Sequence, residues 1–208
     1  ALMYGAAYQK LKKMLGLTDE QAKMLFDAYW DAVEPLKNLR DAVGSSWEAR
    51  GKSFVIAGDG RKIGTRSKHS LLNALFQSGG VICAKYATVF IYQLLEEQGY
   101  KCNPFKEKTI DMCGMIEYHD ECQLAVNPKL VQYKIFKTED ELKEFESTWD
   151  GEQLGSAVDG KNGTLVVALP NPVSKAITKA IDMAVEEVKL KVPLGCEWVV
   201  HKNWMGCH

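Results

Sequence analysis

The segment that decides the fold spans residues 110–126 and reads IDMCGMIEYHDECQLAV. Two runs typical of β-strands flank the acidic pair in His119-Asp120-Glu121 and predict an antiparallel hairpin with a tight reversal. A carboxylate at a strand tip suits Mg²⁺, which usually takes one or two protein carboxylates together with substrate phosphates. We therefore expect Asp120 to bind metal, with Glu121 close to it.

A polar hairpin turn without any chemistry is the alternative interpretation of the same three residues. If the site is catalytic, two Mg²⁺ ions ~3.5–4 Å apart would assist an in-line attack on a phosphate. That chemistry requires a second carboxylate from another element of the chain.

Helical patterns dominate the residues before this segment. A capping box begins at Thr18, and apolar residues then recur every three or four positions up to Pro35, which re-aims the chain into a second helix. Residues 53–65 predict a hairpin closed by an Asp-Gly turn at Asp59-Gly60. From about Ser67 to Gln98 the helical period continues without proline, which predicts the longest helix of the chain.

The residues after the segment mix helix and strand signals. A capping box at Thr138 predicts a charged helix, and turn signals precede an apolar strand at 164–169. An amphipathic helix over 173–188 and a strand over 195–200 are expected to follow. Helices packed on a small antiparallel sheet give an α+β fold class.

The composition limits which binding partners and which cellular compartment can be expected. The net charge of −1 and the sequence pI of about 6.5 do not indicate a polyanionic partner, so binding to nucleic acid must rest on local stripes. Six scattered cysteines without a CxxC pair are typical of reduced thiols, which predicts a cytoplasmic protein. No apolar stretch reaches the ~18 residues of a membrane span, and no membrane partner is expected. The start at Ala1, inside a helical pattern, suggests that an amino-terminal portion lies elsewhere.

A polar and uncharged stripe runs along the predicted long helix. His69, Asn73 and Gln77 fall at positions i, i+4 and i+8 and so share one face. Such side chains suit the minor groove, where every base pair offers purine N3 and pyrimidine O2 acceptors. An ordinary solvated helix face is the alternative.

Positive charges gather around the predicted hairpin and the start of the long helix, where they could hold phosphates or merely be solvated. They are Arg61, Lys62, Arg66, Lys68 and the nearby Lys85. Near the amino end, Tyr4-Gly5 closes an apolar stub. A tyrosine there could stack on a base or pack in a core.

Five motifs, in this order and spacing, together resemble family A DNA polymerases, and above all the replicative polymerases of short-tailed bacteriophages. The likeness covers about residues 1–126 and 170–208. The motifs are Leu2-Met3-Tyr4-Gly5-Ala6, Asp59-Gly60-Arg61-Lys62, Arg66-Ser67 with His69, Asn73, Gln77 and Ser78, His119-Asp120-Glu121, and Asn203-Trp204 near Cys207-His208.

The resemblance implies a division of the chain into fingers and palm. Residues 1–52 would end the fingers, and residues 53–126 and 170–208 would form part of the palm. Residues 127–169 would be an insertion, either an extra palm layer or a surface for docking a partner.

The resemblance also implies roles for single residues. Asp120 and Glu121 would hold two Mg²⁺ ions, shared with an aspartate of motif A, and His119 would contact the primer terminus. Tyr4 would guard the templating position, and Gly5 would let the fingers swing. The residues expected to contact the primer–template are Tyr4, Gly5, Arg61, Arg66, His69, Asn73 and Gln77.

The implied reaction is attack of a primer 3′-hydroxyl on the α-phosphate of a deoxynucleoside triphosphate. The motif A aspartate and the nucleotide-holding residues of the fingers are absent from this chain. We therefore expect it to need an amino-terminal polymerase part or subunit, beside primer–template DNA and the deoxynucleoside triphosphates. The setting would be the host cytoplasm if the source is viral. A non-catalytic module that binds DNA or a partner, derived from a polymerase, is the alternative.

Overall fold

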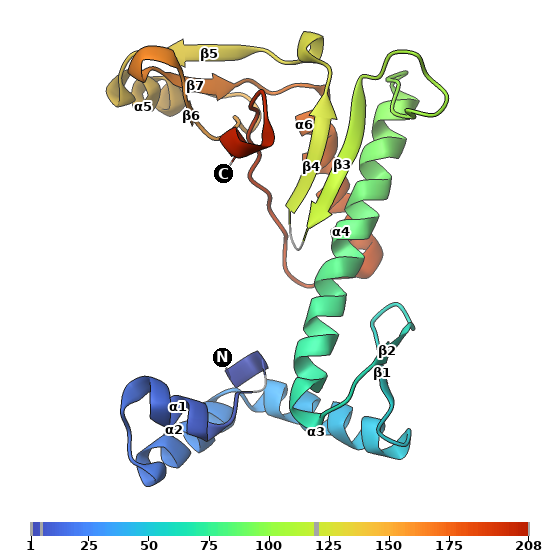
Figure 1. The fold of residues 1–208 in the computed structure, drawn as a ribbon, viewed down its shortest axis with the longest axis vertical. Coiled ribbons are helices and arrows are strands. Elements are labelled where there is room, and N and C mark those ends of the chain that lie inside the picture. The colour runs from blue at the N-terminus through green and yellow to red at the C-terminus, as the bar shows by residue number, and fades with distance from the viewer. Residues whose placement is uncertain (1, 5, 119–120, 208) are drawn as a thin grey trace. The chain divides into compact units, whose positions relative to one another are not determined.

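The computed structural model describes residues 2–4, 6–118 and 121–207 (Figure 1). It has mixed helices and small antiparallel sheets, which confirms the α+β fold class. The chain divides into two compact units, Ala1–Ile82 and Cys83–His208. The finer division into fingers, palm and insertion stays a prediction.

Helices make up most of the first unit. After the short 3-10 helix η1 (Leu2–Tyr4) come α1 (Tyr8–Leu15), α2 (Asp19–Ala32) and α3 (Glu34–Ala49). The capping box at Thr18 is confirmed, because its hydroxyl accepts from the Gln21 amide and the Gln21 side chain accepts from the Thr18 amide. Pro35 stands in the first turn of α3, where a missing amide proton costs no helical hydrogen bond.

The hairpin expected at residues 53–65 is also present. Strands β1 (Phe54–Ile56) and β2 (Lys62–Gly64) pair antiparallel. Gly60 has φ +83°, a left-handed conformation that favours glycine, so the Asp-Gly turn closes the hairpin as its sequence predicts. Trp47, Val55 and Leu71 form the buried core between α3, this hairpin and the long helix α4 (Leu71–Glu97).

Helix α4 is the longest element, as its period predicts, and the 3-10 turn η2 (Lys68–Ser70) leads into it. Within the described part of the chain, Lys68–Glu97 is long and apolar enough to cross a membrane, with mean hydropathy 1.3 and 17% of its window buried. The core helix of a soluble protein passes the same test. The expectation of no membrane partner therefore stays a prediction.

The second unit has its main core between two helices and a hairpin. Strands β3 (Met112–Tyr118) and β4 (Glu121–Val126) pair antiparallel, beside α4 and α6 (Pro172–Val188) (Figure 1). The buried cluster joins α4, β3 and α6 and comprises Ile91, Leu94, Leu95, Cys102, Met112, Val173, Ala176 and Ala180. This packing fixes one face of the hairpin.

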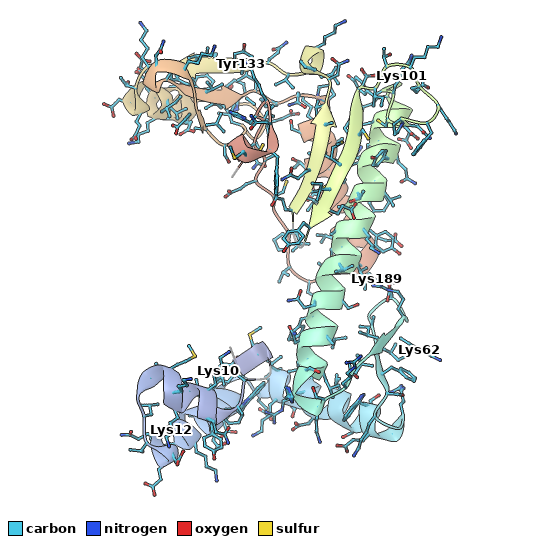
Figure 2. All side chains as sticks on the ribbon, viewed as in Figure 1. Lys10, Lys12, Lys62, Lys101, Tyr133 and Lys189 are labelled. Carbon is cyan, nitrogen blue, oxygen red and sulfur yellow. The ribbon has the colours of Figure 1, made fainter. Side chains whose placement is uncertain are left out.

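Residues 127–169 form a small layer with a core of their own. Here η3 (Pro128–Leu130), β5 (Tyr133–Phe136), α5 (Glu139–Thr148), β6 (Val158–Asp159), η4 (Lys161–Gly163) and β7 (Leu165–Ala168) follow in order. The strands form a sheet in the order β5-β7-β6, and Phe136 and Val167 pack against Leu142 of α5. Tyr133 projects from β5 in Figure 2 and is exposed.

The strand expected at residues 195–200 is not formed, and this prediction is wrong. The backbone there makes isolated hydrogen bonds rather than a ladder: the Trp198 carbonyl accepts from the Ser156 amide at 2.8 Å, and the Cys196 carbonyl accepts from the Gln153 side chain. Regular pairing needs a neighbouring strand in register, which local β-propensity does not supply. The last element among the described residues is the 3-10 helix η5 (Trp204–Cys207).

Cys102 tests the packing of the main core of the second unit. Burial raises the pKa of its thiol to about 11, and the side chain is 2% exposed. At pH 8 only about one thiol in a thousand would be ionised, and thiolate is the reactive form. We expect iodoacetamide to leave Cys102 unmodified in the folded chain and to modify it in urea, as read by peptide mass spectrometry. Labelling of Cys102 as fast as that of the half-buried Cys207 would contradict this packing.

Candidate functional site

The β3–β4 hairpin carries the acidic triplet that the sequence singles out. Tyr118 ends β3 and pairs with Glu121, the first residue of β4, so only His119 and Asp120 separate the two strands in the sequence. Both turn residues lie outside the described residues. The pairing of the flanking strands confirms the antiparallel hairpin that the sequence predicts, while the metal-binding role of Asp120 stays a prediction.

A β-bulge interrupts the pairing of β3 just before this turn. Gly114 pairs with Leu124, whereas Ile116 pairs with Gln123, so Met115 is an extra residue on β3. A bulge bends its strand and shifts the alternation of side chains between the two faces of the sheet. The bulge therefore determines which face the end of β3 presents.

One side chain from α4 reaches this bulge. The Gly114 amide donates a hydrogen bond to the Tyr92 hydroxyl at 2.7 Å, and the Tyr92 ring packs against the buried cluster of the second unit. A methyl group on Gly114 would lie 2.9 Å from the Tyr92 hydroxyl oxygen, which is closer than normal packing allows. Sequence reasoning missed Tyr92, because no local pattern relates a helix residue to a strand 22 positions later.

Glu121 is the described member of the candidate metal site. It is exposed at the start of β4, and its carboxylate accepts a hydrogen bond from the Gln123 side-chain amide. A carboxylate beside the turn fits a hard cation, which needs few protein oxygens when substrate phosphates complete its shell. Among the described residues, no group of three or more His, Cys, Asp or Glu is arranged to hold a metal ion.

The polar stripe lies in the first unit. Asn73 and Gln77 are one turn apart on α4, whereas His69 belongs to η2 and so precedes the α-helix. The Asn73 side chain is half-buried and that of Gln77 is exposed. Neither amide makes a hydrogen bond to another described residue, so both keep their donors for an external acceptor.

Some of the basic residues near β1 and β2 already form ion pairs with carboxylates of the chain, and others do not. The Arg61 guanidinium forms an ion pair with Asp59. Loss of water around the Asp59 carboxyl raises its pKa, but hydrogen bonds from the Arg61 backbone and side chain have the larger combined effect, so the pKa of Asp59 is lowered. The Lys68 ammonium bonds Glu48 at 2.8 Å and lowers the pKa of that carboxyl. Arg66 is exposed and makes no ion pair within the described chain.

Lys62 and the amino-terminal motif complete the candidate residues. The Lys62 ammonium lies 5.1 Å from the centre of the Phe54 ring, and Figure 2 shows the side chain on the β1–β2 hairpin. The Tyr4 backbone belongs to η1, while Gly5 lies outside the described residues. The roles of Tyr4 and Gly5 in binding a template stay predictions.

Three known proteins have similar sequences. The DNA-directed DNA polymerase of Enterobacteria phage T3 is 30% identical over 162 residues, which are 72% of this chain and 22% of that protein. The polymerase of Escherichia phage T7 is 28% identical over 67% of this chain and 21% of that protein. That of Escherichia phage Phieco32 is 30% identical over 64% of this chain and 20% of that protein. The chain thus spans about a fifth of the length of the relatives it matches.

A solved structure shares the fold. The POL domain of Pol1 from M. smegmatis, in complex with DNA primer-template and dNTP, superposes with a TM-score of 0.51 at 17% identity. The match covers 86% of this chain and 25% of that one. No family model matches the chain. The resemblance predicted from the five motifs is confirmed: the sequence is similar to those of phage DNA polymerases, and the fold to that of a polymerase domain.

Proposed function

We propose that this chain, a relative of the phage family A DNA polymerases, is the carboxy-terminal palm and fingers portion of such an enzyme and completes its active site together with an upstream part. The observation that carries the proposal is the β3–β4 hairpin with Asp120-Glu121 at its reversal, in a chain whose sequence is similar to phage DNA polymerases. The reaction would be template-directed transfer of a nucleotide to a primer. The setting would be the cytoplasm of an infected host.

Asp120 and Glu121 would hold Mg²⁺ together with a motif A aspartate of the upstream part. When bound, two such ions would neutralise charge and stabilise the attacking and leaving oxygens of the displacement. Glu121 supports this assignment, because it is an exposed carboxylate directly after the turn. His119 would contact the primer terminus from the same turn.

The other residues of the proposal would grip the primer–template. Asn73 and Gln77 have amide donors without partners in the described chain and would bond acceptors in the minor groove that all base pairs share. Arg66 would bind a phosphate, since no carboxylate neutralises it within the described chain. Arg61 would first have to exchange Asp59 for a phosphate oxygen. His69, Tyr4 and Gly5 would complete the contacts.

Primer extension tests the proposal directly. The purified chain is incubated with a labelled primer–template, Mg²⁺ and four deoxynucleoside triphosphates, alone and then mixed with its candidate upstream partner. We expect extension only in the mixture. Extension by the chain alone would contradict the need for a partner. Duplex binding without extension in either sample would favour a non-catalytic module.

Alanine at Asn73 or Gln77 tests the minor-groove contacts. Each change should weaken primer–template binding or raise mismatch extension by about 1 kcal/mol, the size of one lost neutral hydrogen bond. Fluorescence anisotropy gives the affinity, and single-nucleotide extension from matched and mismatched primers gives the fidelity. Gln93→Ala serves as the control, since it removes an exposed glutamine from the same helix. Unchanged affinity and fidelity in both variants would rule the contacts out.

A further inference from the structure

We propose that Tyr92 is a positioning residue for the His119-Asp120-Glu121 segment. Its hydroxyl stabilises the β-bulge in β3, and the bulge determines toward which face of the sheet the end of β3 is directed before this segment begins. The structural part of this proposal concerns β3, β4 and the part of α4 that belongs to the second unit. Its link to catalysis rests on the proposed function.

The register shows what the bulge does to the hairpin. Before the bulge, Met112 pairs with Val126 and lies in the core, with 0% of its surface exposed. After the bulge, Tyr118 pairs with Glu121 and is 67% exposed. Met112 and Tyr118 are six positions apart, so a regular strand would place both on one face. The extra residue Met115 sends the end of β3 to the opposite face.

The hydroxyl of Tyr92 satisfies a backbone group at the bulge. A bulge disrupts the ladder locally, so the backbone groups beside it lose their regular strand partners. The Gly114 amide, directly before Met115, donates to the Tyr92 oxygen at 2.7 Å. Because the Tyr92 ring packs against the buried cluster, the position of the oxygen is tied to the rigid part of the unit.

The hairpin has one obvious competing register. If β3 continued from the Gly114–Leu124 pair without a bulge, Ile116 would pair with Cys122 in place of Glu117. Glu117 would then face Glu121, and like charges directly opposite each other are unfavourable. In this register Glu117 would be the last paired residue of β3, and Tyr118 would join the turn instead of pairing with Glu121. The Tyr92 hydrogen bond and the charge pattern thus favour the same bulged register.

Nuclear magnetic resonance distinguishes the two registers in the isolated chain. Cross-strand contacts between Glu117 and Cys122 report the bulge, and contacts between Ile116 and Cys122 report its loss. We expect Tyr92→Phe to raise the bulge-free population, and the exchange rate of the Gly114 amide, about fivefold, since one hydrogen bond is lost. Tyr86→Phe is the matched control, because that ring stacks on Phe90 of the same helix and is not bonded to Gly114. A Tyr92→Phe register and exchange rate equal to those of the unmodified chain would overturn the proposal.

A second variant keeps the test independent of the first. Gly114→Ala places a methyl group against the Tyr92 oxygen, so it should also favour the bulge-free register. Because the phenylalanine variant removes the clashing oxygen, the double variant Tyr92→Phe/Gly114→Ala should behave like Tyr92→Phe alone. Additive effects of the two changes would show that they do not act through this contact.

The effect of Tyr92 on catalysis is tested by measuring kcat separately from the affinities for primer–template and nucleotide. In primer extension with the upstream partner, Tyr92→Phe should lower kcat about tenfold and leave the primer–template Kd and nucleotide KM within about twofold. Tyr86→Phe should leave all three unchanged. A Tyr92→Phe variant that loses affinity and keeps kcat would overturn the positioning role. If the unmodified mixture is inactive, the proposed function fails, whereas the resonance experiment still decides whether Tyr92 holds the bulge.

Discussion

Replacing Asp120 by alanine is expected to abolish nucleotide incorporation by the assembled enzyme, while primer–template affinity stays within about tenfold of the original. The change removes a proposed metal ligand and not a contact that grips DNA, so the loss should fall on the chemical step. Single-turnover primer extension measures this step. Fluorescence anisotropy of a labelled primer–template measures affinity separately.

Asp182→Ala is the matched control for this experiment. Asp182 is an exposed aspartate on α6 of the same unit, and its loss should leave incorporation unchanged. If Asp120→Ala loses binding to the primer–template as well as activity, the metal role of Asp120 is wrong. Full activity of Asp120→Ala would contradict the proposed active site altogether.

Leu95→Ala should cost the second unit about 2–5 kcal/mol of unfolding free energy, the range found for large-to-small changes in a packed core. Leu95 is 0% exposed and lies on α4 within the cluster that also contains Met112 and Ala180. The removed methyl groups leave a cavity that a helix packed on two sides closes poorly. Urea denaturation with amide exchange of β3, β4 and α6 measures the change in this unit.

Val89→Ala supplies the comparison on the same helix. Val89 is 51% exposed, so its truncation should change the unfolding free energy by no more than about 0.5 kcal/mol. Equal destabilisation by the two variants would show that α4 does not pack in the chain as described.

Local signals predicted the secondary structure wherever one chemical cause dominates. The capping box at Thr18 and the Asp-Gly turn at Gly60 each fix a backbone geometry through a few neighbouring atoms, and both are present. The 3.6-residue period predicted α4 and α6 for the same reason. The strand expected at 195–200 failed, because strand formation depends on a partner strand that lies elsewhere in the sequence.

The candidate site was predictable to a similar extent. The position of Glu121 after a strand reversal and of Asn73 and Gln77 on one helix followed from composition and period. The bulge at Met115 and the hydrogen bond from Gly114 to Tyr92 did not, because the bulge depends on how β3 pairs with β4 and the hydrogen bond depends on a helix residue 22 positions earlier. His69 was expected on the α-helix, yet the helix begins two residues later.

The two ends of the segment between the β3–β4 hairpin and α6 lie next to each other in the second unit. The Gln132 carbonyl, just before β5, accepts a hydrogen bond from the Leu169 amide, just after β7, at 2.8 Å. Chain length added or removed between two such neighbouring points costs little closure entropy. The segment is therefore a place where the length of the chain can change at little entropic cost, so an affinity tag or a fluorescent reporter can be grafted there.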